Sequence, residues 1–291
     1  MRFYEFRSLN LPVLTSEAAR TLLKAREEGL RTVSLAYNLG LSRGMVELTS
    51  DGAVIEGRVV NYDELQLALR DEDAIFIVEP HGRLRKAILY TEDRLYKLKK
   101  VAEDDAPTLE INGVPIHRLE GARLWEGALQ KVGLAKIERG AKVLDLCTGL
   151  GYTAIASIMC GASEVWTVEK DVNVLRMAEV NPWSKGLEDV RIVKVLGDAS
   201  EAVLELGDKG FMVIIHDPPS IAQAPELYTA ELYEGMYKLL EGGGRLVHFV
   251  GPTISRARGM DLLQAISRRL RSIGFVVKVD KELMGIVATK E

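Results

Sequence analysis

Cysteine is scarce in this sequence of 291 residues, where only Cys147 and Cys160 occur. Disulfide bonds are therefore not needed to hold the fold, and a composition with 47% hydrophobic and 27% charged residues is typical of a globular protein in a reducing compartment. Long apolar runs are also missing, because none approaches the roughly 18 residues of a membrane helix. Residues 1–11 carry charges where a signal peptide would be apolar. We expect a cytoplasmic location and no membrane partner.

An excess of positive charge is absent too. The net charge of −4 gives no general attraction for nucleic acid, so any such contact has to be local. Residues 253–275 form the one conspicuous basic segment, in which five arginines accompany a single acid, Asp261. The arginines are Arg256, Arg258, Arg268, Arg269 and Arg271. We hypothesise that RNA contacts the protein through this segment, whereas nothing in the sequence indicates an oligomeric state.

The sequence also lacks histidines at the spacing of metal ligands. The four histidines stand at positions 81, 117, 216 and 248, and no two of them have the local spacing of zinc ligands. We therefore predict no metal site. Internal repeats and low-complexity tracts are missing as well, so a solenoid or a disordered tail is not indicated.

The chain contains two blocks of different pattern. Residues 1–105 predict a smaller N-terminal α+β accessory domain, with a helix that Ser16 caps and Gly29 ends. Asp51-Gly52 is the strongest hairpin signal in this block. A charged, turn-rich patch at residues 102–107 is the predicted linker between this block and the second one.

Residues 106–291 predict a hairpin around Asn112-Gly113 and then strands that alternate with helices. Such alternation implies parallel strands joined by right-handed crossovers. The last two strands leave no room for a helix between them, so the final strand should be antiparallel. The predicted strands are residues 142–146, 164–168, 190–196, 212–216, 245–250, 276–278 and 286–289. This α/β, Rossmann-like sheet of seven strands resembles the class I methyltransferase arrangement.

The first of these strands ends in Asp145 and leads into a helix through a glycine-containing loop. The loop holds Thr148, Gly149 and Gly151, and glycines there let the backbone approach a bound ligand closely. Dinucleotide sites use a similar loop with a third glycine, where this chain has Ala154, and they bind a pyrophosphate. A carboxylate beside the loop repels phosphates and suits the ammonium and sulfonium charges of S-adenosylmethionine. The loop therefore favours S-adenosylmethionine over a dinucleotide.

Two further acids follow the next two strands. Glu169 ends the second strand, where its carboxylate can accept hydrogen bonds from both ribose hydroxyls, and Asp198 follows the third, beside the adenine amino group. The alternative interpretation is that each acid caps a helix or lies in solvent. Three acids at three successive strand ends favour a cofactor site.

A second motif begins at Asp217, where an apolar strand stops at Asp217-Pro218-Pro219. Ligands bind at the carboxyl ends of the strands in open α/β sheets. Methyltransferases that act on exocyclic amines of nucleobases carry a resembling tetrad, which usually ends in an aromatic residue. There the acid and the first proline's carbonyl accept hydrogen bonds from the target amine and align it with the methyl group. Asp217, Pro218 and Pro219 are therefore the predicted catalytic residues, acting mainly by alignment.

Ser220 departs from that tetrad, because a serine cannot stack on a flipped base. Tyr228 is a candidate replacement for the aromatic, although an aromatic there also fits a core position. His216 is a candidate proton acceptor or a structural residue at a strand end. Arg256 and Arg258 follow the fifth strand and are candidates for steering a phosphate, or are part of a solvated helix face.

From about Asp63 to its end the chain resembles an archaeal group of predicted methyltransferases. The resemblance implies the class I fold and S-adenosylmethionine as the cofactor. The residues that carry it are 106–111, 145–153, 168–171, 181–184, 214–219 and 242–246.

Three functions compete on this basis. The leading hypothesis is an N-methyltransferase whose acceptor is an exocyclic amine of an RNA base. The second is a methyl- or aminopropyltransferase for a small-molecule amine, and the third is a cofactor-binding subunit without catalysis.

Overall fold

The computed structural model describes residues 1–117, 123–207, 209–250 and 256–291, with side chains described from residue 260 onward in the last range. Contacts divide the chain into two units. The large unit comprises Met1–Phe6, Glu126–Leu175 and Gly186–Glu291, and the small unit comprises Arg7–Trp125 and Arg176–Lys185. Each unit has an apolar core of its own.

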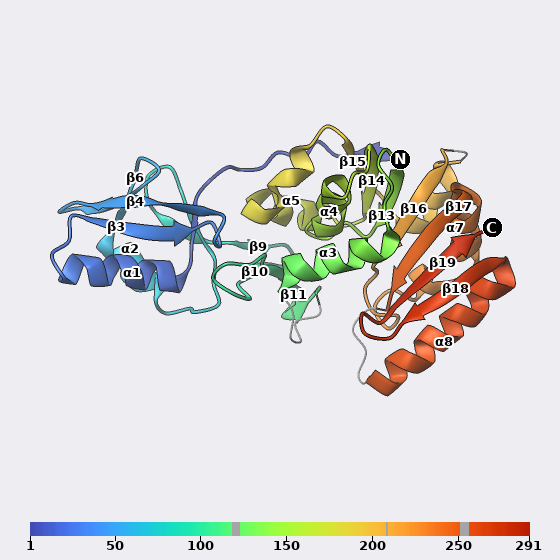
Figure 1. Ribbon diagram of the computed structural model, residues 1–291. Coiled ribbons are helices and arrows are strands. Elements are labelled where there is room, and N and C mark those ends of the chain that lie inside the picture. The colour runs from blue at the N-terminus through green and yellow to red at the C-terminus, as the bar shows by residue number, and fades with distance from the viewer. Residues whose placement is uncertain (118–122, 208, 251–255) are drawn as a thin grey trace. The chain divides into compact units, whose positions relative to one another are not determined.

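Among its described residues, the large unit is built on one eight-stranded sheet with the order β1-β15-β14-β13-β16-β17-β19-β18 (Figure 1). Five central strands run parallel, and β19 is antiparallel to both β17 and β18. The strands are β1 (Arg2–Phe3), β13 (Lys142–Leu146), β14 (Glu164–Glu169), β15 (Ile192–Leu196), β16 (Phe211–His216), β17 (Leu240–Phe249), β18 (Phe275–Asp280) and β19 (Gly285–Lys290).

The sheet has one strand more than the seven predicted. The short β1 pairs antiparallel with the edge strand β15, Arg2 lying opposite Leu196. Two residues with no apolar alternation give no sequence signal for a strand, so only the pairing reveals this one.

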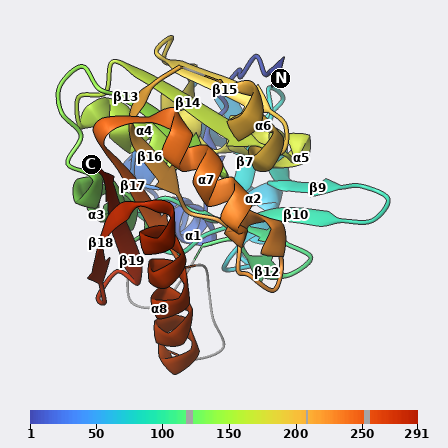
Figure 2. The same cartoon turned by 90° about the vertical axis from the view of Figure 1, so that its right-hand side faces the viewer.

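Helices cover both faces of this sheet. One face buries Leu144, Trp166 and Ile214 against α6 (Ala199–Glu205), α7 (Ala230–Leu239) and α8 (Arg256–Ile273), which Figure 2 shows in front of the strands. Val143 and Val165 point to the opposite face and are equally buried, as both faces of a parallel sheet require. The remaining helical segments are α3 (Leu124–Ala135), α4 (Tyr152–Met159), α5 (Val172–Val180) and the 3-10 turns η1 (Pro182–Glu188) and η2 (Pro225–Tyr228).

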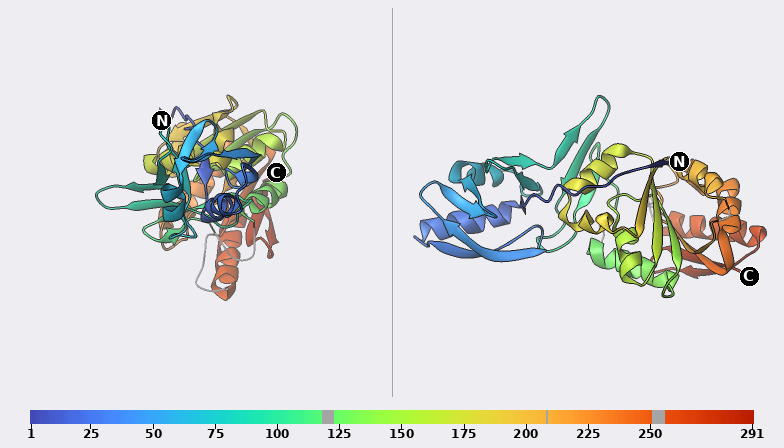
Figure 3. Two further views of the ribbon diagram at one scale, coloured as in Figure 1. Left: turned by 90° about the vertical axis from the view of Figure 1, so that its left-hand side faces the viewer. Right: turned by 90° about the horizontal axis from the view of Figure 1, so that it is seen from above.

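The small unit packs α1 (Ser16–Glu27) and α2 (Tyr62–Ala68) against antiparallel sheets around its own apolar core (Figure 3). Its largest described sheets have four strands each, in the orders β3-β4-β5-β6 and β12-β11-β10-β9. The strands are β2 (Val13–Leu14), β3 (Thr32–Tyr37), β4 (Ser42–Leu48), β5 (Gly52–Ile55), β6 (Arg58–Asn61), β7 (Phe76–Val78), β8 (Leu84–Lys86), β9 (Ile88–Tyr90), β10 (Leu95–Lys99), β11 (Thr108–Ile111) and β12 (Val114–Pro115).

Both predicted hairpins form. Asp51-Gly52 lies at the β4–β5 connection, and Asn112-Gly113 joins β11 to β12 with φ values of 51° and 80°. Positive φ at both central residues is what a tight two-residue hairpin turn requires, and Asn-Gly tolerates it best.

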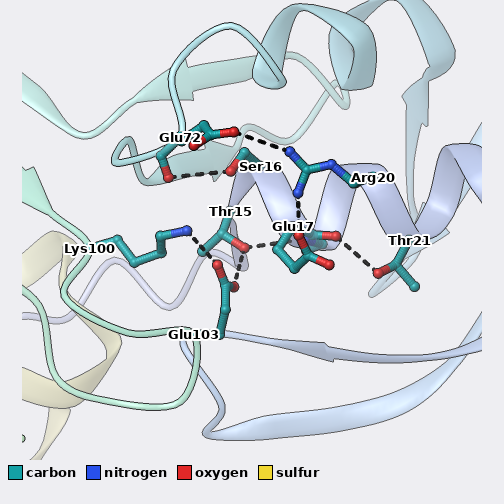
Figure 4. A network of polar contacts seen from close by, with 9 residues as sticks. Thr15, Ser16, Glu17, Arg20, Thr21, Glu72, Lys100 and Glu103 are labelled. Carbon is teal, nitrogen blue, oxygen red and sulfur yellow. Dashed lines mark hydrogen bonds and ion pairs between the residues drawn. The ribbon is translucent and has the colours of Figure 1, made fainter.

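Helix α1 begins one residue earlier than predicted. Thr15, rather than Ser16, is the N-cap, because its Oγ1 accepts a hydrogen bond from the Ala18 N–H at 3.2 Å (Figure 4). The same hydroxyl donates to Glu103 Oε2 at 2.6 Å, and Glu103 also pairs with Lys100. Ser16 lies inside the helix and donates to the Glu72 carbonyl at 3.3 Å.

The charged patch at residues 102–107 is not an exposed linker, because Asp105 and Ala106 are buried within the small unit. The Asp105 carboxylate accepts hydrogen bonds from the Leu124 N–H at 2.6 Å and the Trp125 N–H at 3.3 Å, at the start of α3. The contacts divide the chain after Trp125 instead of after residue 105, since β11 pairs with β10 across the predicted boundary.

Replacing Asp105 by alanine should lower the free energy of unfolding by about 1–3 kcal/mol, because two helical N–H groups lose a buried acceptor. Urea unfolding would measure the loss. The matched control is Asp104→Ala, whose carboxylate is exposed and pairs with Arg123, so its loss should cost less than about 1 kcal/mol. Equal destabilisation by the two variants would contradict the capping role of Asp105.

Candidate functional site

The loop between β13 and α4 has a backbone that only a few residue types tolerate. Gly149 and Gly151 have φ values of 54° and 81°, and Cys147 also adopts a positive φ of 72°. A Cβ on Gly151 would collide with the side chain of Leu187. The glycines predicted from the sequence are therefore required by the backbone itself, and a non-glycine residue in this region marks local strain.

Asp145 lies at the centre of a buried polar chain behind this loop. Its Oδ1 accepts a hydrogen bond from Thr153 Oγ1 at 2.8 Å and its Oδ2 accepts one from Thr167 Oγ1 at 2.7 Å. Thr148 Oγ1 lies 2.6 Å from Thr167 Oγ1 and extends the chain into the loop. The sequence predicted that this carboxylate faces the cofactor, whereas in the structure both oxygens bind threonines that hold β13, β14 and α4 together.

The Asp145 carboxyl is withdrawn from water, and this burial raises its pKa to about 7. The two threonine hydroxyls act in the opposite direction by stabilising the charged form, while the charges of Asp217 and Glu169 raise the pKa further. The influence of both acids on Asp145 indicates that all three carboxyl groups lie in one region of the large unit.

Glu169 lies at the carboxyl end of β14 and contacts the glycine loop directly. Its Oε2 accepts from the Gly149 N–H at 3.0 Å and its Oε1 accepts from the Asp171 N–H at 3.0 Å. Burial raises the pKa of Glu169, although the backbone N–H groups counteract this. The predicted partners Gly149 and Glu169, twenty residues apart in sequence, are therefore neighbours in the fold.

Asp198 follows β15 and caps α6. Its Oδ1 accepts from the Ser200 N–H at 2.8 Å, which is the structural role that the sequence left open. The preceding Gly197 N–H donates to the Glu169 carbonyl at 2.9 Å, so the segment after β15 lies beside the end of β14. The carboxyl ends of three adjacent strands thus present Asp145, Glu169 and Asp198 in the order of the sheet.

The Asp-Pro-Pro turn follows β16, on the other side of β13. Asp217 forms an ion pair with Lys131 of α3, and the Lys131 ammonium also lies 5.2 Å from the centre of the Phe249 ring. Sequence reasoning missed Lys131, because it lies 86 residues before Asp217 on a helix without a motif. Its charge neutralises the acid that was predicted to receive the substrate amine.

Two side-chain hydrogen bonds, one from a tyrosine and one from a serine, fix the shape of this turn. Tyr228 Oη donates to the Pro219 carbonyl at 2.7 Å, and Ser220 Oγ donates to Gln223 Oε1 at 2.8 Å. The Tyr228 ring is only 2% exposed. It therefore offers no face on which a base could stack, and its core position, which the sequence left as an alternative, is the one observed.

His216 and His248 lie side by side in the core beneath the turn, with ring centres 4.6 Å apart. His216 Nε2 donates to the Leu227 carbonyl at 2.8 Å, and burial lowers its pKa to about 4. His248 Nδ1 donates to the His216 carbonyl and its Nε2 accepts from Tyr233 Oη at 3.0 Å. Both rings are neutral near pH 7 and act as packed, structural residues.

The side chains of Arg256 and Arg258 lie outside the described residues. Within the described part of the chain no cluster of three or more His, Cys, Asp or Glu residues could hold a metal ion. No described helix is both long and apolar enough to span a membrane.

The chain is similar over almost its whole length to the uncharacterized protein MJ1233 of Methanocaldococcus jannaschii. The two chains are 36% identical over 289 residues, which cover 97% of this chain and 96% of the relative. The chain belongs to the MJ1233 family. The family described as conserved hypothetical protein 95 matches a shorter stretch, residues 129–241.

Other relatives of this MJ1233 family member cover less of it. A polyamine aminopropyltransferase of Korarchaeum cryptofilum is 30% identical over 137 residues, 46% of this chain and 43% of that protein. A protein-L-isoaspartate O-methyltransferase of Thermococcus onnurineus is 31% identical over 121 residues, 40% of this chain and 48% of that protein. These two partial matches are to an aminopropyltransferase and a methyltransferase.

The fold is shared with spermidine synthase, solved in complex with the transition-state analogue AdoDATO. The TM-score is 0.55 at 17% identity, over 70% of this chain and 74% of that one. A mixed α/β sheet flanked by helices is thus common to the MJ1233 family and to this enzyme.

Replacing Asp145 by asparagine should change how stability depends on pH. In the wild type the folded state keeps a proton on Asp145 up to about pH 7, whereas the unfolded chain releases it near pH 4. Stability contributed by this group is therefore full below about pH 4 and is lost as the pH rises toward 7. Asparagine has no such titration, and it can accept from one threonine and donate to the other.

Urea unfolding between pH 4 and pH 8, without added cofactor, measures this effect. The stability of Asp145→Asn relative to the wild type should rise with pH by on the order of a few kcal/mol, and level off above pH 7. Glu169 titrates in both proteins, so the difference between the two curves reports Asp145 together with its charge interaction with Glu169. Parallel pH curves for the two proteins would show that Asp145 is charged in the folded state at pH 5.

Proposed function

We propose that this protein is an S-adenosylmethionine-dependent N-methyltransferase whose acceptor is an exocyclic amine of an RNA base. The observation that carries the proposal is the contact between Glu169 and the Gly149 N–H, which joins the glycine loop to the acid of the next strand. A glycine loop after the first strand of the site and an acid at the end of the next strand are the two features expected of a class I methyltransferase. The position of β13 between β14 and β16, with β19 antiparallel, also fits that arrangement.

The donor and acceptor set of the site fits S-adenosylmethionine better than a dinucleotide. The carboxylates of Glu169 and Asp198 lie at the ends of adjacent strands, and the loop itself, Cys147 to Gly151, contains no lysine or arginine. Such a set attracts a sulfonium and an ammonium and accepts from ribose hydroxyls, but it repels a pyrophosphate. Glu169 would hold the ribose, Asp198 would approach the adenine, and Gly149 and Gly151 would admit the ligand. When bound, the cofactor supplies a methyl group on a positively charged sulfur, which leaves readily.

Asp217 and the two prolines would hold the acceptor amine. A carboxylate oxygen and the Pro218 carbonyl can each accept one N–H, which directs the nitrogen lone pair away from the turn. Tyr228 keeps the backbone of the turn fixed through the Pro219 carbonyl. Catalysis then depends chiefly on alignment, and the amine proton can leave to Asp217 or to water after the transfer.

The ion pair of Asp217 with Lys131 supports a neutral acceptor. A protonated polyamine would have to displace the lysine from Asp217, whereas a neutral base amine needs only a free lone pair on the carboxylate. A base carried by RNA meets this requirement. The small unit then serves as an accessory domain for a large substrate, and the basic segment that includes α8 faces its phosphates.

A second candidate function is aminopropyl transfer to a small amine from decarboxylated S-adenosylmethionine. The partial match to the polyamine aminopropyltransferase and the shared fold of spermidine synthase favour it. The two reactions use the same adenosyl site and differ in the group that leaves the sulfur. Incubation with each labelled donor separates them, because methyl label in RNA supports the first and label in a polyamine fraction supports the second.

The cofactor and reaction roles can be separated by two substitutions. Glu169→Gln should weaken S-adenosylmethionine binding by about 10- to 100-fold, since a charged acceptor for ribose hydroxyls is lost. Asp217→Ala should bind the cofactor normally and lose methyl transfer to total RNA by about 100-fold or more. Calorimetry and labelled-methyl incorporation are the measurements. Glu164→Gln, at the opposite end of β14, is the matched control and should change neither. Unchanged turnover in Asp217→Ala would refute the role of the turn.

Lys131 can be tested in the same assay. Lys131→Met leaves Asp217 without its cation, so we expect turnover to fall at least about 10-fold while cofactor affinity stays constant, and Lys131→Arg should recover most of the activity. Lys142→Met removes an exposed lysine of β13 and serves as the control. If the methionine variant is as active as the wild type, the ion pair has no part in holding the acceptor.

A further inference from the structure

A cavity of about 270 Å³ lies beside α8, away from the glycine loop. Four of its lining residues stand on one face of the helix, at the spacing of three and four residues that brings side chains together. Val279 of β18, the edge strand of the sheet, completes the wall. The helical residues are Gln264, Ser267, Arg268 and Arg271. Figure 2 shows α8 next to β18 and β19.

The charge of this cavity is positive and uncompensated. Within the described residues no ion pair joins Arg268 or Arg271 to a carboxylate, although many exposed cations of the chain have such a partner. Arg271 donates only one described hydrogen bond, a long one of 3.4 Å to the Val277 carbonyl, out of five N–H donors. By contrast, Arg269 points to another side of α8 and donates to the Tyr228 carbonyl.

Ser267 provides an independent sign of a ligand. Its side chain is 2% exposed and lines the cavity, yet its Oγ has no hydrogen-bond partner among the described residues. A buried serine in a helix normally donates to the carbonyl four residues earlier, as Ser157 does to Thr153 at 2.7 Å in α4. An unpaired buried hydroxyl is destabilising, so a free donor in the lining of a cavity that two arginines also line indicates an acceptor from outside the chain.

We propose that this cavity binds a phosphate group, with Ser267 Oγ and the guanidinium groups of Arg268 and Arg271 as donors. Guanidinium groups bind phosphate oxygens in pairs, and a hydroxyl donor suits a third oxygen of the same tetrahedral group. Two acids lie near the cavity in sequence. Asp261 lies one helical turn before Gln264 and forms no described ion pair with either arginine, and Asp280 accepts from the Glu282 and Leu283 N–H groups in its own turn, at 3.0 and 2.9 Å. The charge of Asp280 is therefore already stabilised by backbone N–H groups of its own turn.

The phosphate belongs to a backbone phosphodiester of the RNA acceptor. This assignment of the source rests on the proposed function, whereas the phosphate site itself does not. Asp261 is the one acid among residues 260–273, where three arginines are also exposed, so the charge of the exposed side of α8 is positive. Contacts to phosphates position a nucleic acid without reading its sequence, which leaves base selection to the Asp-Pro-Pro turn.

Binding of a fluorescein-labelled single-stranded 20-nucleotide RNA to the full chain, without cofactor, tests the proposal. Arg268→Ala/Arg271→Ala should weaken binding at least about 10-fold and reduce the slope of log affinity against log salt by about 0.7, the value for one phosphate contact on a single strand. The matched control, Arg139→Ala/Lys238→Ala, removes two exposed cations of the large unit and should weaken binding by less than about 3-fold. Equal losses in the two double variants would overturn the site.

A second variant guards against misfolding of the first. Ser267→Ala removes the unpaired hydroxyl, so we expect the melting temperature of the free protein to rise while RNA affinity falls about 3- to 10-fold. A purely structural serine would leave RNA affinity unchanged, and that result would count against the proposal.

Inorganic phosphate, followed by line broadening of its phosphorus resonance, distinguishes the sources. Broadening that Arg268→Ala/Arg271→Ala abolishes, with no effect on RNA, supports a site for free phosphate. RNA binding that depends on the arginines, without methyl transfer to RNA, supports the phosphate site and refutes the proposed acceptor. If Arg268→Ala/Arg271→Ala changes neither RNA binding nor the broadening of the phosphate resonance, the phosphate site is refuted. This holds whether or not the protein transfers a methyl group to RNA.

Discussion

The hydrogen bonds between the Asp145 carboxyl and two threonine hydroxyls are the interaction on which the rest of the site depends. They connect β13 to β14 through Thr167 and to α4 through Thr153, and so fix where the strand ends and the helix begins. The glycine loop, with its positive φ angles, lies between these two ends. A buried acid with satisfied oxygens is thus a structural part of the site, a role that differs both from the predicted contact with the cofactor and from the alternative of a helix cap or a solvated acid.

The reaction end is held by residues from three different elements of the fold. Lys131 reaches Asp217 from α3, Tyr228 reaches the Pro219 carbonyl from η2, and Arg269 reaches Tyr228 from α8. The Tyr228 contact spans nine residues, whereas the Lys131 and Arg269 contacts span 86 and 41 and depend on the completed fold. Contacts from three elements therefore hold the turn in place. A fixed turn suits a reaction whose rate depends more on the position of the acceptor nitrogen than on a strong acid or base.

Local patterns predicted the parts of the fold that local forces determine. The apolar runs at 142–146 and 212–216 became β13 and β16 because both sheet faces are buried, and Asn112-Gly113 formed its turn because the backbone there needs positive φ. Strand β1 and the Lys131 contact were missed, since each arises only from pairing across the chain. The patch around Asp105 was misread because a charged run usually lies in solvent, whereas here one acid caps a helix.

The pairing of β1 with β15 has a consequence for the order in which the chain matures. Arg2 lies opposite Leu196, so β1 can find its partner only after the chain has been synthesised as far as β15. The small unit consists mostly of residues between these two points and contains its own core, so it can collapse in the interval. Strand β1 then remains unpaired until β15 has been made, and its docking completes this edge of the sheet.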